Sequence, residues 1–75
     1  MEQAYFSPSM RLVIKVLQLN GWMTPKEIIK ETTLPPRTVK YAIKKLRERQ
    51  IIQEKPNLDD LRSKLLRINM QNLPQ

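Results

Sequence analysis

The first stretch of the chain with helical periodicity covers residues 8–19 and predicts a helix. Ser7 is suited to cap this helix, Pro8 fits its first turn, and Gly21 is placed to end it as a left-handed cap. The apolar positions occupy more than one side of the helix, and they are Met10, Leu12, Val13, Ile14, Val16, Leu17 and Leu19. A helix this apolar is expected to lie at the centre of the fold or to be covered in part by a partner.

A second helix is predicted to begin directly after Thr24. Thr24, Pro25 and Glu27 form a capping box, in which threonine caps the helix, proline takes the first turn and glutamate reaches back from the third position. The helix is expected to end near residues 31–33, because the Leu-Pro-Pro sequence at residues 34–36 disfavours helix and forces a turn.

A third helix is predicted from Pro36 to about Arg49. Four apolar residues recur at the spacing of a core-facing stripe, namely Val39, Ala42, Ile43 and Leu46. The opposite face carries Arg37, Tyr41, Lys44 and Glu48, with Lys40 and Lys45 at its sides. A solvated face usually mixes charges of both signs, whereas this face holds a single glutamate, so the pattern favours contact with a polyanion.

Two strands and a turn are predicted to follow the third helix. Residues 51–55 begin with β-branched side chains, and residues 56–60 have the composition of a turn. Residues 63–69 then place Leu66 and Ile68 alternately inward. The order helix, helix, tight turn, helix and β-hairpin is that of a winged helix-turn-helix, an α+β fold that is mostly α.

The chain length of 75 residues allows one domain. We expect a single domain over residues 1–75, with a core of about residues 8–69 and short flexible termini. The apolar link at residues 22–23 is short enough for a strand of one or two residues, and Trp22 is expected to be a core or sheet-edge aromatic. Three methionines are expected to be packing residues: Met10, Met23 and Met70.

Positive charge is concentrated in one part of the chain. The sequence holds 14 Lys and Arg against 7 Asp and Glu, a net charge of +7, and its pI is about 10.2. Residues 36–55 alone carry seven of these cations and two glutamates, a net charge of +5, which solubility does not require. A basic domain with its charge gathered on one helix is typical of a protein that binds nucleic acid.

The residue inventory argues against an enzyme. The chain has no Cys and no His, which excludes disulfides and thiolate sites and removes the commonest general base. No spaced carboxylate pair, glycine-rich phosphate loop or nucleophile–base arrangement is visible, and the adjacent Asp59 and Asp60 fall short of a cation site. We therefore expect no cofactor, no metal and no small-molecule ligand. Without a long apolar run or a signal peptide, a cytoplasmic location is expected, or a nuclear one in a eukaryote.

Three stretches resemble the winged-helix core of MarR-family transcriptional regulators. Residues 23–29 are similar to the opening of that family's second helix, and residues 34–52 to its turn, recognition helix and first wing strand. Residues 60–68 resemble its wing, in which an acidic residue precedes an arginine near the tip. The resemblance covers about residues 10–69 and implies a transcriptional regulator that binds double-stranded DNA.

The sequence departs from the MarR pattern in three respects. Gln50 stands where glycine is usual after the recognition helix, and Pro35 stands where a serine-type cap is usual. The 75 residues also hold no counterpart of the long flanking helices through which MarR proteins dimerise. The resemblance therefore does not imply that this chain dimerises in the MarR manner or senses a ligand at such an interface.

The third helix and the hairpin supply the candidate DNA contacts. The residues expected to contact double-stranded DNA are Arg37, Thr38, Lys40, Tyr41, Lys44, Lys45, Lys55, Arg62 and Lys64. Arg37 is suited to a bidentate bond with guanine, whereas Lys40 and Lys44 are equally suited to phosphates. Arg62 near the wing tip either enters a minor groove or pairs with Asp60 to stiffen the turn, and the two roles are compatible.

A second function is also consistent with the sequence, that of a protein-interaction module of the transcription machinery. In that case the wide apolar face of the first helix is the working surface, and the basic helix binds an acidic partner. RNA binding is disfavoured, because the deep and narrow major groove of A-form RNA does not admit a helix. For the DNA-binding form we expect a homodimer through the first helix together with Tyr5 and Phe6.

Overall fold

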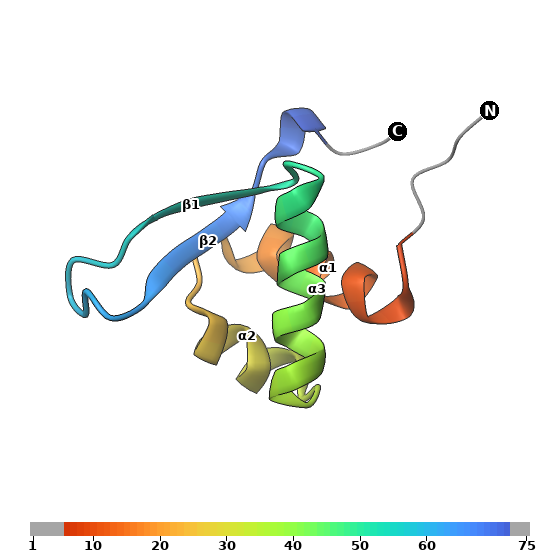
Figure 1. Ribbon diagram of the computed structural model, residues 1–75, viewed down its shortest axis with the longest axis horizontal. Coiled ribbons are helices and arrows are strands. Elements are labelled where there is room, and N and C mark those ends of the chain that lie inside the picture. The colour runs from red at the N-terminus through yellow and green to blue at the C-terminus, as the bar shows by residue number, and fades with distance from the viewer. Residues whose placement is uncertain (1–5, 73–75) are drawn as a thin grey trace.

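Three helices and a β-hairpin follow one another in the predicted order (Figure 1). The computed structural model describes residues 6–72. Tyr5 and most of the ends that were predicted to be flexible lie outside the described residues. The elements are α1 (Pro8–Asn20), α2 (Pro25–Thr32), α3 (Pro36–Glu48), β1 (Ile52–Pro56), β2 (Lys64–Ile68) and the short 3-10 helix η1 (Met70–Asn72). The predicted winged helix-turn-helix fold is confirmed.

The helices begin where their capping residues predict. The Ser7 hydroxyl accepts a hydrogen bond from the Met10 N–H at 3.3 Å. Both bonds of the capping box at α2 are present, since Thr24 Oγ1 accepts from the Glu27 N–H at 3.1 Å and Glu27 Oε1 from the Thr24 N–H at 2.9 Å. Helix α3 starts at a proline and has no side-chain cap, as Pro35 implies.

Three residues with positive φ mark the ends of the helices. Gly21 has φ 75° and ψ −133°, so the prediction of a left-handed cap is wrong at this position. The extended ψ directs the chain from α1 straight into the strand-like residues 22–23. Thr33 ends α2 in the left-handed region, and Gln50 keeps φ 59° at the position after α3 where glycine is usual.

Helix α1 is the central element of the core and packs behind α3 (Figure 1). Five of its residues are buried, namely Met10, Val13, Ile14, Val16 and Leu17. The predicted stripe of α3 is buried against them, with Val39 and Leu46 fully enclosed. Leu12 and Leu19 remain 37% and 75% exposed, so the domain itself covers most, but not all, of the apolar surface of α1.

The antiparallel hairpin is joined to the helices through one further β-bridge. Its register runs from the Ile52–Ile68 pair to the Pro56–Lys64 pair. Met23 forms an isolated bridge with Leu66, which confirms the short strand predicted between the first two helices. Among residues 6–72, none of the helices has the length and hydrophobicity that crossing a bilayer requires.

Two packing predictions are corrected by the structure. Met10 and Met23 are buried as predicted, but Met70 is 62% exposed on η1, because the chain turns away from the core after β2. Phe6 was expected at a partner interface, yet it packs against the domain's own core, with the Arg49 guanidinium 5.2 Å from its ring centroid.

Candidate nucleic-acid interface

The exposed face of α3 presents three cations that make no ion pair among residues 6–72. Arg37, Lys40 and Lys44 are exposed, and among residues 6–72 no salt bridge or cation–π contact involves them. Tyr41 lies between them in sequence and is 60% exposed, while Thr38 is half-buried. The predicted DNA-contacting face therefore exists as an accessible surface of the helix.

Two further cations near the end of α3, Lys45 and Arg47, are held by neighbours. Lys45 Nζ lies 3.9 Å from a carboxylate oxygen of Glu48 and 5.5 Å from the centroid of the Tyr41 ring. Arg47 forms an ion pair and hydrogen bond with Glu54 on β1. This pair ties the end of α3 to the hairpin, which gives Arg47 a role within the fold.

A hollow of about 620 Å³ lies between the beginnings of α2 and α3 and the turn of the hairpin. Its lining residues are Thr24, Pro25, Lys26, Ile29, Pro36, Lys40, Asn57, Asp60, Arg62 and Ser63. Three of them are cations that come from three different elements: Lys26 from α2, Lys40 from α3 and Arg62 from the wing. The hollow is thus a concave surface with positive charge on three sides.

Lys26 is the residue at this site that the sequence did not indicate. It lies in a segment of nearly balanced charge, residues 1–35, which holds four cations and three glutamates. Only the folded arrangement brings the first turn of α2 beside the wing. No local pattern in the sequence reports that approach.

The turn of the hairpin is tied by hydrogen bonds to its own side chains. Asp60 Oδ1 accepts from the Arg62 N–H at 3.1 Å and from Arg62 Nε at 3.3 Å. Asn57 Oδ1 accepts from the Asp59 N–H at 3.1 Å. The predicted Asp60–Arg62 pair is therefore present, and yet the Arg62 side chain is 92% exposed, which leaves its guanidinium accessible.

The two predicted lysines of the strands point to opposite faces of the hairpin. Lys64 Nζ lies 3.5 Å from Glu54, the residue that also binds Arg47, so Lys64 is on the face toward α3. Lys55 follows Glu54 in the strand and therefore faces the other way. Its Nζ lies 4.4 Å from the centroid of the Trp22 ring, and the Arg67 guanidinium lies 4.8 Å from the same ring. The sequence was sufficient to assign these cations to the hairpin, but it did not show which of them lie on which face of the hairpin.

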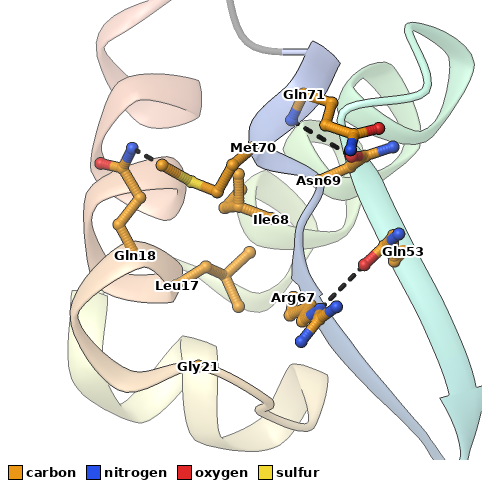
Figure 2. A pocket seen from close by; sticks show the side chains of 9 residues that line it. All are labelled: Leu17, Gln18, Gly21, Gln53, Arg67, Ile68, Asn69, Met70 and Gln71. Carbon is orange, nitrogen blue, oxygen red and sulfur yellow. Dashed lines mark hydrogen bonds between the residues drawn. The ribbon is translucent and has the colours of Figure 1, made fainter.

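A second hollow, of about 440 Å³, lies at the base of the hairpin between α1, β2 and η1 (Figure 2). Leu17 and Ile68 supply its apolar lining. The Arg67 Nε donates to Gln53 Oε1 at 2.8 Å on one side, and Gln18 approaches the Met70 sulfur at 4.0 Å on the other. This hollow is separated from the first by the length of the hairpin.

A family model described as winged helix-turn-helix DNA-binding matches residues 7–53, from the cap of α1 into β1. The chain belongs to this family. The family is one of DNA-binding domains, and the chain shares its fold with a solved MarR-family protein. None of the curated proteins compared with the chain matches it.

Solved structures, MarR-family members among them, share the fold of the chain at low sequence identity. The chain is similar to the zinc-responsive MarR family member ZitR of Lactococcus lactis, with a TM-score of 0.81 and 20% identity over 95% of this chain and 49% of that one. It is also similar to YusO of Bacillus subtilis, with a TM-score of 0.80 and 21% identity over 88% of this chain and 47% of that one. A third similar structure is that of BpsR of Bordetella bronchiseptica, whose DNA binding is regulated by 6-hydroxynicotinic acid. It has a TM-score of 0.78 and 19% identity over 92% of this chain and 52% of that one. The chain thus spans about half the length of these proteins.

Proposed function

We propose that this domain binds preferred sequences in double-stranded DNA and regulates transcription. Helix α3 enters the major groove, and the turn of the hairpin reaches the adjacent minor groove. The sugar-phosphate backbone that separates the two grooves then lies in the hollow between them. The observation that carries this proposal is the convergence of Lys26, Lys40 and Arg62 on that hollow from three separate elements.

The residues of α3 divide into base contacts and phosphate contacts. Arg37 stands at the beginning of the helix, where side chains approach base edges, and its guanidinium suits guanine O6 and N7. Tyr41 and Lys44 lie on the same exposed face of the helix. Tyr41 contacts a thymine methyl group or a phosphate, and Lys44 contacts a phosphate. Thr38 is half-buried beside them and contacts a phosphate from the edge of the helix.

The cations that are held within the domain take lesser roles on DNA. Lys45 and Lys64 flank the interface and add to its positive potential, although each has a carboxylate neighbour. Lys55 stacks on Trp22 on the face of the hairpin away from α3, so we infer that it acts mainly in holding the sheet.

The structure lends less support to a protein-interaction module. That function relied on the apolar face of α1 as the working surface, and five of its residues are buried in the domain's own core. What remains is Leu12 and Leu19, seven residues apart and hence on one side of the helix. We infer that two domains pair through this side of α1, without Phe6. Native mass spectrometry that returned monomer alone at high micromolar concentration would exclude the pairing.

The affinity for a labelled random duplex, measured by fluorescence anisotropy across salt concentrations, tests DNA binding. We expect log K to fall with log salt at a slope of roughly −4 to −7, since each neutralised phosphate contributes about −0.9. Lys40→Ala should flatten the slope by about 0.9. Lys30→Ala removes the same charge from the exposed last turn of α2, outside the hollow, and should leave the slope unchanged. Absence of binding at low salt would overturn the proposal and favour a protein partner for the basic helix.

A further inference from the structure

Two leucines at the turn of the hairpin are exposed by the fold. Leu58 is 84% exposed, the most of any large apolar side chain among residues 6–72, and Leu61 is 75% exposed. A single exposed leucine is ordinary. Here two of them share one short turn with Arg62, at the far end of the wing (Figure 1).

The turn that carries these leucines is held in one shape by its hydrogen bonds. The Asp60 N–H donates to the Asn57 carbonyl at 3.0 Å, and the Ser63 N–H donates to the Asp60 carbonyl at 3.1 Å. The Asn57 side-chain amide donates to the Ser63 hydroxyl at 3.3 Å and closes the turn from one end to the other. A turn fixed in this way loses little conformational entropy on binding.

The formal charges of the turn sum to zero, so the turn as a whole attracts phosphates less than α3 does, although Arg62 remains accessible. Residues 57–64 hold two aspartates, Asp59 and Asp60, against Arg62 and Lys64. Asp60 is paired with Arg62, and Lys64 is paired with Glu54 on the neighbouring strand. This balance contrasts with the lysines that α2 and α3 contribute to the hollow, and it points to a contact that depends on apolar surface and shape beside Arg62.

We propose that Leu58 and Leu61 enter the minor groove beside Arg62 and pack against the sugars and base edges that form its walls. The proposal rests on the placement of DNA across the hollow, which brings the turn of the hairpin to that groove. Leucine is among the apolar side chains that proteins insert into minor grooves, and arginine is attracted to narrow ones. The neutral turn equally disfavours a strongly acidic protein as the occupant.

The double variant Leu58→Ala/Leu61→Ala tests the apolar contact. We expect its affinity for duplex DNA to fall roughly 10-fold at every salt concentration, because apolar surface is no longer buried. The salt slope should stay that of the wild type, because no phosphate contact is lost. Met70→Ala shortens an exposed apolar side chain on η1, away from the hollow, and serves as the matched control with wild-type affinity.

Replacing adenine with 2,6-diaminopurine in the duplex tests the groove. The substitution adds an amino group to the minor groove and leaves the major-groove edge of the base unchanged. Wild-type protein should lose affinity on the substituted duplex, and the double leucine variant should lose a smaller factor, because the two changes affect one contact. Equal loss in both proteins would overturn the proposal.

The outcomes separate this proposal from the function on which it rests. If the leucine variant binds as tightly as the wild type while Lys40→Ala is weakened, the leucines have no part in DNA binding and only this proposal fails. If the wild-type domain does not bind duplex DNA at low salt, both proposals fail together.

Discussion

The hollow between α2, α3 and the hairpin turn carries cations, and so does the outer face of the hairpin, the face that points away from α3. The two sets of cations differ in what surrounds them. In the hollow, Lys26 and Lys40 make no ion pair or ring contact among the described residues 6–72. On the outer face, Lys55 and Arg67 both lie on the Trp22 ring. The same residue types therefore hold the fold together in one region and remain available to a ligand in the other. Net charge does not distinguish the two regions.

Two matched double variants give the largest expected difference between these regions. Lys26→Ala/Lys40→Ala should weaken DNA binding about 60-fold at 0.1 M salt, because each lost phosphate contact lowers the salt slope by about 0.9, with little change in stability. Lys55→Ala/Arg67→Ala removes the same charge and should reduce DNA affinity far less. It should lower the free energy of unfolding by about 1–2 kcal/mol, because two ring contacts are lost. Equal losses of affinity, measured by anisotropy, would mean that charge alone governs binding.

Trp22→Ala should produce the largest loss of stability with no loss of DNA affinity. The half-buried ring contacts Lys55 and Arg67 and stands beside the Met23–Leu66 bridge, so its removal should cost about 2 kcal/mol. In thermal unfolding this corresponds to a decrease in Tm of roughly 8–15 °C for a domain of this size. Trp22→Phe retains a ring and should lose about half as much. A folded Trp22→Ala protein with impaired DNA binding would place the outer face in the interface.

Glu54→Gln should convert two paired cations into available ones. Glu54 binds both Arg47 and Lys64, and loss of its charge should destabilise the domain by at most about 1 kcal/mol, since the pairs are partly exposed. DNA affinity should rise a few-fold, with a steeper salt slope, as a negative charge leaves the face toward α3. Asp59→Asn is the matched comparison, because it also replaces a carboxylate by its amide, and Asp59 forms no ion pair among residues 6–72. Unchanged affinity in Glu54→Gln would show that this face lies outside the reach of DNA.

Gln50→Gly gives the smallest expected effect, and it is confined to stability. Gln50 has φ 59°, a conformation that glycine adopts without steric cost. The substitution should raise the free energy of unfolding by about 0.5 kcal/mol, measured by urea denaturation, and leave DNA affinity unchanged. A decrease in stability would mean that the glutamine side chain contributes more at the end of α3 than the backbone conformation costs.

Local patterns were sufficient to predict most of the fold. The cap at Ser7, the capping box at Thr24 and the apolar stripe of α3 are all short-range signals, and each appears in the structure at its predicted position. The end of α1 was harder to predict, because a glycine allows several conformations with positive φ and only the path to Met23 selects one.

The interface was predictable in part. The exposed cations of α3 follow from helical spacing, since the core stripe fixes the opposite face. The direction of Lys55 depends on strand register, in which a shift of one residue reverses the face, and β1 begins one residue later than predicted. Lys26 depends on how α2 packs against the wing, which no single segment encodes.

Amide chemical shifts of the ¹⁵N-labelled domain during titration with duplex DNA test most directly which surface binds. The proposal predicts that the largest changes fall on residues 24–26, 36–44 and 57–63, which border the hollow and form the exposed beginning of α3. The Trp22 indole should change little. Largest changes at Trp22, Lys55 and Arg67, with the hollow unaffected, would contradict the assignment of DNA to the hollow and place it on the outer face of the hairpin.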